Sequence, residues 1–112
     1  MIDEVVLAAL KESLGDDGTL MQQLIDLYVT DSPKQLADAS AALLQGDQAS
    51  LARAAHSLKS TSASMGAATV SALARDLEQQ AKQGDLASSA AVLARLKPEL
   101  DGAIAALSKL KF

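Results

Sequence analysis

Apolar residues recur every three or four positions along most of this chain, which is the spacing of helices that bury one face. A short first helix is predicted between Asp3, a capping residue, and Gly15, a stop. Its apolar stripe consists of Leu7, Leu10 and Leu14. A longer helix follows Asp16 and Asp17, either of which is a suitable cap. Its expected inward face consists of Leu20, Leu24, Leu27 and Tyr28.

The pair Ser32-Pro33 interrupts this second segment. Beyond it, a new stripe ends at Gly46 and is displaced from the preceding stripe by roughly 100°. This stripe consists of Leu36, Ala39 and Leu43. Two interpretations fit: one long helix kinked at Pro33, or two helices with Ser32 as N-cap and Pro33 in the first turn. The pattern alone does not choose between them.

Three more helices follow, separated by glycine and aspartate residues. The third opens at Asp47 and closes at Gly66, and its inward face consists of Leu51, Ala54, Ala55, Leu58, Ser62 and Met65. The fourth ends at Gly84, and its stripe consists of Val70, Leu73, Leu77 and Ala81. Asp85 caps the fifth, which Pro98 is expected to kink. The fifth stripe consists of Leu86, Leu93, Leu96, Leu100, Ile104, Leu107 and Leu110.

Short connections between such helices make sequence neighbours antiparallel. Alanine and leucine dominate the composition, which favours helix throughout, and 112 residues suffice for one core but not for two. The expected fold is therefore all-α: an antiparallel four-helix bundle with a short additional N-terminal helix. Residues 1–112 are expected to form this single domain.

Composition excludes several classes of function. The chain has no cysteine, which removes thiol nucleophiles, cysteine zinc sites and disulfides, and one histidine with dispersed carboxylates gives no metal-ligand set. Ten basic residues are scattered among fourteen acidic ones, and the aromatic residues are Tyr28 and Phe112, so we expect no nucleic-acid partner. The N-terminus lacks a signal-peptide pattern, and no apolar run is long enough for a membrane span. We expect a cytoplasmic monomer with no membrane partner.

The one histidine occupies an unusual position. On a helical wheel with Leu51 at zero, the leucines of residues 47–66 cluster near zero and His56 falls at about 140°, facing solvent. Arg53 and Lys59 lie three residues to either side. The other neighbours on this face are small: Ala52, Ser60 and Ala63. The imidazole therefore stands on a lightly crowded surface beside two cations.

This arrangement suits phosphoryl transfer. A neutral imidazole, with an unperturbed pKa near 6.5, has a free lone pair and needs no neighbouring base to act as a nucleophile. Lys59, one turn along, can pair with a phosphoryl group on His56, and an exposed pair of this kind is worth at most about 1 kcal/mol. The competing interpretation is that His56 is an incidental surface residue and that Arg53 and Lys59 are ordinary solvated charges.

Residues 55–67 read AHSLKSTSASMGA and closely resemble AHxLKGxSxxxGA, the signature of the histidine-containing phosphotransfer (HPt) family. Tyr28 stands where that family tends to have an aromatic residue, Gly46-Asp47 resembles its usual break, and Leu77-Glu78 resembles its Leu-Glu pair. The resemblance implies that His56 is the phosphoacceptor and that Lys59 neutralises the phosphoryl group. It also shows one departure, since the family's glycine after the lysine is Ser60 here.

Three further residues, Arg53, Ser60 and Glu78, are candidates for support. The hydroxyl of Ser60 could add a hydrogen bond. Arg53 flanks the histidine and adds positive charge. If the third and fourth helices form a hairpin about Gly66, residues 76–78 lie level with His56, so Glu78 could accept a proton from the imidazole nitrogen that is not phosphorylated. Glu78 could equally be a solvated surface acid.

The predicted function is that of a phosphorelay intermediate, which accepts a phosphoryl group on His56 from a receiver-domain aspartate and passes it to a response-regulator aspartate. Its partners would be receiver domains of hybrid sensor kinases and of response regulators. The sequence contains no ATP-binding motif, so we expect a carrier that is not an enzyme and has no cofactor, with Mg²⁺ supplied by the receiver. The alternatives are a helical interaction module without phosphotransfer, or the phosphoacceptor module of a larger hybrid or chemotaxis-type kinase.

Overall fold

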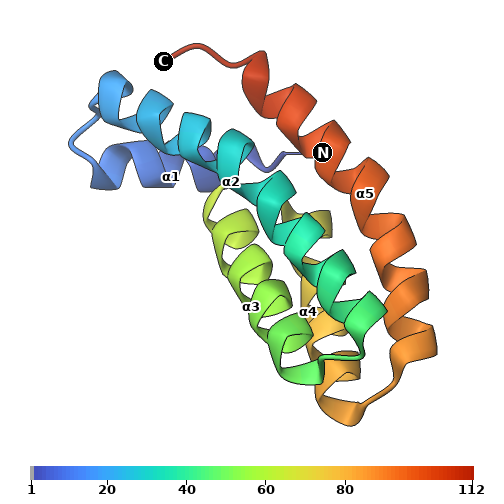
Figure 1. Ribbon diagram of the computed structural model, residues 1–112. Helices are drawn as coiled ribbons and strands as arrows, with labels where there is room; N and C mark the ends of the chain where they lie inside the picture. The colour runs from blue at the N-terminus through green and yellow to red at the C-terminus, as the bar shows by residue number, and fades with distance from the viewer. Residues whose placement is uncertain (1) are drawn as a thin grey trace.

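The computed structural model describes residues 2–112 as five helices joined by short turns (Figure 1). They are α1 (Glu4–Ser13), α2 (Gly18–Gln45), α3 (Gln48–Ser64), α4 (Ala68–Gln83) and α5 (Leu86–Ser108). These residues include no strand, which confirms the all-α prediction. None of the helices in residues 2–112 combines the length and the apolar character needed to cross a lipid bilayer.

The four long helices surround one elongated core. Helix α3 packs against α2 and α4, and α5 packs against the same two helices, so the contacts close a ring. Figure 1 shows these helices side by side, with consecutive ones running in opposite directions, and α1 lies beside the first turns of α2. The whole measures 43 × 22 × 20 Å. This arrangement is consistent with the expected antiparallel four-helix bundle and its additional N-terminal helix.

Aspartate and glycine residues set the helix boundaries, as the sequence predicts. Four helices begin at an aspartate whose carboxylate accepts backbone N–H groups of the first turn: Asp3, Asp17, Asp47 and Asp85. Asp17 is thus the cap of α2, and Asp16 lies in the preceding turn with φ of 59°. Gly46 and Gly84 end α2 and α4 in the left-handed conformation.

Helix α2 runs without interruption through Pro33, so the one-helix interpretation is correct. Pro33 cannot donate a hydrogen bond to the preceding turn. Ser32 is not an N-cap: its side chain is buried, and its hydroxyl donates to the carbonyl of Tyr28 at 2.6 Å. Helix α5 likewise continues through Pro98.

The predicted inward face of α2 is partly wrong. Leu20 and Leu27 are 43% and 57% exposed. The buried face consists instead of Met21, Ile25, Tyr28, Ser32, Leu36, Ala39 and Ala42. Residues 20–29 carry two apolar stripes one position apart, and both have helical periodicity. Packing against α3 and α5, rather than periodicity, therefore selects which stripe is buried.

The core positions of the later helices agree better with the sequence. All four predicted positions of α4 are buried, as are Leu51, Ala55, Leu58, Ser62 and Met65 of the α3 segment. Ala54 is partly buried. Leu86 is 38% exposed because it is the first residue of α5 and lies at the end of the bundle. Leu93, Leu96, Leu100 and Leu107 are buried.

The turn at Gly66 joins three parts of the fold. The carbonyl of Gly66 accepts a hydrogen bond from the backbone N–H of Asp3 at 2.8 Å, which ties the start of α1 to the α3–α4 turn. Gly66 has φ of +73°, and a Cβ atom there would lie 2.6 Å from the carbonyl oxygen of Asp3. Glycine is therefore required at position 66 both by backbone conformation and by this close approach.

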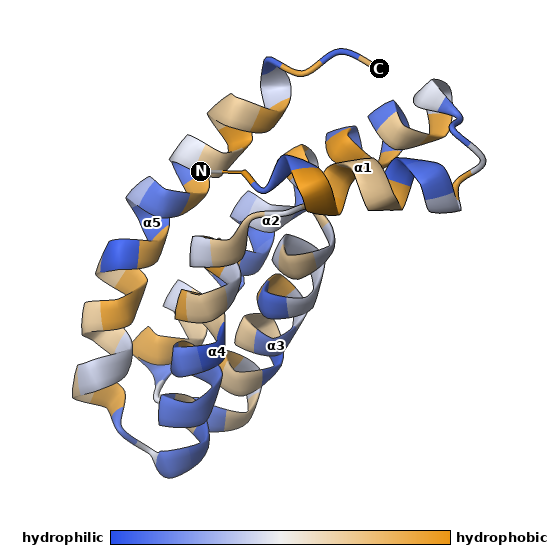
Figure 2. Ribbon diagram, turned by 180° about the vertical axis from the view of Figure 1, so that it is seen from behind, coloured by the Kyte–Doolittle hydropathy of each residue, from blue (hydrophilic) through white to orange (hydrophobic). Residues whose placement is uncertain are grey.

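Figure 2 shows that α1 is largely hydrophobic, as expected of a helix held against the end of the bundle.

Candidate functional site

His56 lies on the outward face of α3, as its helical position predicts. The inward face of α3 consists of Leu51, Ala55, Leu58 and Ser62, all of them buried. The His56 side chain is 60% exposed. Its neighbours one turn away, Ala52 and Ser60, are small, as is Ala63 further along. A partner protein can therefore approach the imidazole closely.

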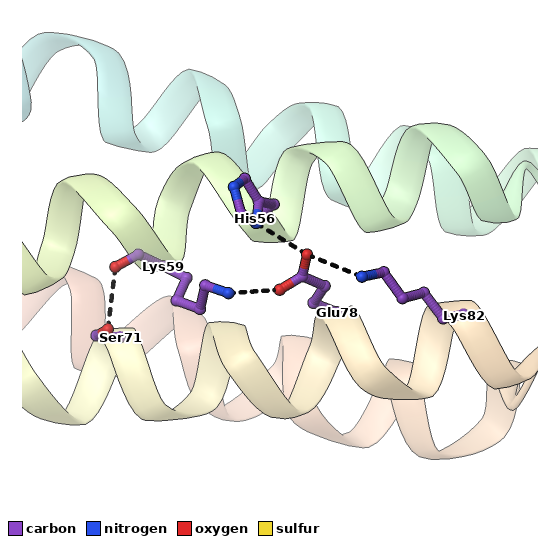
Figure 3. Close-up of polar contacts among 5 residues, drawn as sticks. All are labelled: His56, Lys59, Ser71, Glu78 and Lys82. Atoms are coloured by element: carbon purple, nitrogen blue, oxygen red, sulfur yellow. Dashed lines mark hydrogen bonds and ion pairs between the residues drawn. The ribbon is translucent and has the colours of Figure 1, made fainter.

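Glu78 of α4 contacts the imidazole from the neighbouring helix. The α3–α4 hairpin turns at Gly66, and the burial of Leu77 in the core places Glu78 at the edge of the helix interface. Glu78 is only 7% exposed, and its Oε2 lies 2.9 Å from Nδ1 of His56 (Figure 3). Glu78 is therefore a mostly buried acid in direct contact with the histidine, not a solvated one.

Two lysines share the Glu78 carboxylate. The ammonium group of Lys59 donates to Oε1 at 2.8 Å, and that of Lys82 lies 3.4 Å from Oε2. The hydrogen bond from Lys59 has the largest effect on the pKa of Glu78, and it lowers that pKa. Burial raises the pKa, whereas the hydrogen bond from His56 and the charges of both lysines lower it further. Together they lower the pKa of Glu78 from its ordinary 4.5 to about 2. At neutral pH, Glu78 is therefore a carboxylate.

The contact with Glu78 fixes the tautomer of His56. A carboxylate only accepts hydrogen bonds, so Nδ1 must be the donor. In a neutral imidazole this leaves the lone pair on Nε2. Figure 3 shows the second ring nitrogen on the side of the ring turned away from Glu78. The nitrogen able to attack an electrophile is thus the one that faces outward.

Lys59 lies one turn from His56, as the sequence predicts, and its side chain has a partner that was not predicted. Its ammonium group pairs with Glu78 in this structure, and its side chain is 31% exposed. Its backbone carbonyl also accepts a hydrogen bond from the Ser71 hydroxyl of α4 at 3.0 Å. Lys59 is therefore held to α4 through both its side chain and its backbone, one turn from His56.

The other two candidates lie outside this cluster. Arg53 donates to the hydroxyl of Ser50 at 3.0 Å, near the start of α3, and borders a groove that Asp38 of α2 also lines. Ser60 is exposed one turn after His56 and borders a different groove. The structure thus joins His56, Lys59 and Glu78 in one cluster, which includes neither Arg53 nor Ser60.

Lys82 and Ser71 also contact this cluster, and neither was predicted from the sequence. Lys82 follows Glu78 by four residues, which is the spacing of helical ion pairs, so it could have been found once Glu78 was placed. Ser71 had no such signal, because its contact with Lys59 depends on the register between α3 and α4.

An apolar groove of about 490 Å³ opens beside this face, between α1, α2 and α3. It is lined by Leu10, Leu24, Leu27, Tyr28, Asp31, Ser32, Gln35, Ser60, Thr61, Ser64 and Met65. The side chain of Tyr28 forms a buried hydrogen bond with Ser62 at 2.7 Å, and burial raises its pKa. The exposed side chain of Leu27 thus contributes to an apolar surface that begins one turn along α3 from His56.

The chemistry available here is that of one nitrogen nucleophile. Residues 2–112 contain no cluster of three or more acidic, histidine or cysteine side chains placed to hold a metal ion. The cluster offers an exposed imidazole of fixed tautomer, a buried carboxylate and two ammonium groups. Such a set can carry a negatively charged group on Nε2 and stabilise it.

Comparisons with known proteins agree with this geometry. A family model described as "Hpt domain" matches residues 23–109. Histidine-containing phosphotransfer protein B (HptB) from Pseudomonas aeruginosa PAO1 is 31% identical; the match covers 96% of this chain and 91% of that one, with a TM-score of 0.88. The HPT domain of an Hpt sensor hybrid histidine kinase from Shewanella has the same fold, with 19% identity, coverage of 92% and 89%, and a TM-score of 0.75.

No match was found among the curated proteins. The family match nevertheless covers most of the chain, and the likeness to HptB covers nearly all of it. The chain belongs to the Hpt domain family, the phosphocarrier modules of two-component signalling.

Proposed function

We propose that this chain is an intermediate of a multistep phosphorelay, in which His56 accepts a phosphoryl group from a receiver-domain aspartate and passes it to the aspartate of a response regulator. The observation that carries this proposal is the contact between His56 Nδ1 and Glu78, because it leaves Nε2 unprotonated on the exposed side of the ring. The nucleophile is thus oriented before any partner binds.

In the first step, the lone pair of Nε2 attacks the phosphorus atom of an aspartyl phosphate. An N–P bond forms, the P–O bond to the aspartate breaks, and the aspartate leaves as a carboxylate. The ring keeps its proton on Nδ1 and becomes positively charged, and Glu78 stabilises that charge through the existing hydrogen bond. The second step reverses these changes on another receiver.

Positioning and neutralisation of charge dominate in-line phosphoryl transfer. We expect the receiver to supply Mg²⁺, so that the carrier needs no cofactor of its own. Lys59 lies one turn from His56 and can move its ammonium group from Glu78 to the phosphoryl oxygens. Arg53 would add positive charge at longer range, and the hydroxyl of Ser60 would lie on the side from which the receiver approaches.

Receiver docking fits the surface that runs from His56 into the apolar groove. The small residues around His56 allow close approach, and the groove offers apolar area to a helix of the partner. Leu27 lines this groove and is exposed although apolar, which is typical of an interaction surface. We propose that the contact is transient and that the carrier is monomeric.

The direct test is transfer from a radiolabelled phospho-receiver to the purified chain. The proposal predicts acid-labile, alkali-stable label on the chain, absent from His56→Gln. A known phosphocarrier that accepts label from the same receiver serves as the control. If that carrier is labelled and this chain is not, across the receivers of its host, the alternative of an interaction module without phosphotransfer is favoured.

A further inference from the structure

Lys82 contacts the oxygen of Glu78 that also contacts the histidine. Oε2 lies 2.9 Å from His56 Nδ1 and 3.4 Å from Lys82 Nζ. The distance between His56 Nδ1 and Lys82 Nζ is therefore at most the sum of these two distances. Figure 3 shows Lys59 and Lys82 approaching the carboxylate from opposite ends, with His56 above it. The imidazole thus lies within the field of two cations and one anion.

A carboxylate alone would create a difficulty for this histidine. It fixes the proton on Nδ1, but it also stabilises the doubly protonated imidazolium. An imidazolium has no lone pair on Nε2 and cannot attack phosphorus. Glu78 would then favour the correct tautomer and, at the same time, the inactive protonation state.

We propose that Lys82, together with Lys59, offsets the charge of Glu78, so that Glu78 holds the imidazole proton on Nδ1 without drawing a second proton onto Nε2. The cluster of two lysines and one glutamate has a net charge of +1, which disfavours an additional positive charge on the ring. Lys82 is a positioning residue, because it acts on the histidine through Glu78. The inference rests on the proposed function only in taking Nε2 as the attacking nitrogen.

Other charged groups lie around this cluster on the packed elements. Helix α3 contributes Arg53, which is bonded to Ser50, and α2 contributes Asp38 in the groove that Arg53 borders. Arg75 of α4 and Asp3 before α1 line a groove with Lys59. Within residues 2–112, the ion pairs of Glu78 are those with His56, Lys59 and Lys82. These two lysines are therefore the cations that balance its charge most directly.

The expected effect is measurable but modest. Two unit charges about 6 Å apart in water interact by an amount equivalent to about half a pH unit in a titration midpoint. Removing the charge in Lys82→Met should raise the midpoint of the His56 titration by about that much. The effect should be larger in low salt than in high salt, because Lys82 is exposed. The double variant Lys59→Met, Lys82→Met should show about twice the shift.

The test is an NMR titration of the ring nitrogens in the full chain. His56 is the sole histidine in the sequence, so one titration curve is obtained without assignment. Lys82→Arg should restore the original midpoint. Lys97→Met is the matched control, since Lys97 also forms an exposed i,i+4 ion pair, with Asp101 of α5 at 2.9 Å. It should leave the midpoint unchanged.

An unchanged or lowered midpoint in Lys82→Met, with the control behaving as expected, would overturn the inference. A second readout is the pH dependence of phosphotransfer, whose acid limb should move to higher pH in Lys82→Met by the same amount. The titration needs no partner protein, so it is independent of the proposed function. A shifted midpoint in a chain that never accepts phosphate would support the role of Lys82 and contradict the phosphorelay.

Discussion

Nδ1 of His56 lies 2.9 Å from Oε2 of Glu78, across the interface between α3 and α4. The two residues are separated by 22 positions in the sequence, and the hairpin about Gly66 brings them together. The proposed phosphoacceptor side chain is thus oriented by a neighbouring helix rather than by its own. The orientation of the imidazole therefore depends on how α3 and α4 pack.

Replacing Glu78 should change the tautomer of His56. In Glu78→Ala the acceptor for Nδ1–H is lost, so we expect the Nε2–H form to increase and transfer to slow by about five- to tenfold, the equivalent of one oriented hydrogen bond. In Glu78→Gln the side-chain oxygen can still accept, so the tautomer should be retained. Nitrogen-15 chemical shifts of the ring measure this directly. Identical spectra for Glu78→Ala and the unaltered chain would contradict the orienting role.

Stability should depend on pH through Glu78. The pKa of Glu78 in the folded chain, about 2, is below the ordinary 4.5. The contribution of its carboxylate to the free energy of unfolding is therefore complete above pH 4.5 and is lost as the pH falls toward 2. We expect a contribution of about 2 kcal/mol near neutral pH, after allowing for solvent around both lysines. Urea unfolding of the unaltered chain and Glu78→Gln at neutral pH and near pH 3 measures it. The difference in free energy of unfolding between the two proteins should be smaller at the lower pH. A difference that does not change with pH would exclude this linkage.

The apolar groove should contribute to receiver binding. Leu27→Lys places a charge in the groove and removes apolar area that the partner would bury, so we expect Kd to rise about tenfold or more. Leu44→Lys is the matched control on the same helix, since Leu44 is 88% exposed and lies outside the groove. Calorimetry with a receiver domain measures both variants. Equal effects on Kd would show that docking occurs elsewhere.

Alanine substitutions at Gly66 and Gly46 distinguish two causes of strain, the backbone conformation and a close contact. Gly46 has φ of +68° with nothing within 4 Å of a Cβ atom, so Gly46→Ala should cost about 1 kcal/mol of stability from backbone conformation alone. Gly66→Ala has the same conformational cost and also brings Cβ to 2.6 Å from the carbonyl oxygen of Asp3. We expect it to cost about 1–2 kcal/mol more. Urea unfolding measures the stability of both variants. Equal losses of stability would mean that the backbone at Asp3 moves away from the new Cβ atom without cost.

The sequence predicts helix boundaries and the exposure of His56 well, because these are local properties. Capping by aspartate, stops at glycine and the position of a residue relative to a leucine stripe depend on the next few residues alone. The buried face of α2 could not be predicted in this way. Its two apolar stripes are equally periodic, and Leu27 is exposed while Ile25 is buried because of how other helices pack.

The polar cluster was predictable only in part, for a similar reason. The hairpin about Gly66 places Glu78 level with His56, but side-chain contacts depend on the exact register of two helices. The position of Lys59 one turn from His56 was predicted, but its pairing with Glu78 was not. The contact between Ser71 and Lys59 likewise depends on the packing of α3 and α4. The pair of Lys82 with Glu78 lies within α4 and follows from the i,i+4 spacing once Glu78 is placed at the site.

The measurement that tests the central claim most directly is the position of the phosphoryl group on the ring. The chain is labelled with nitrogen-15, phosphorylated by a phospho-receiver and examined by phosphorus and nitrogen NMR. Because Glu78 occupies Nδ1, we predict a phosphorus–nitrogen bond at Nε2 of His56. Phosphate on Nδ1, or on a residue other than His56, would contradict it.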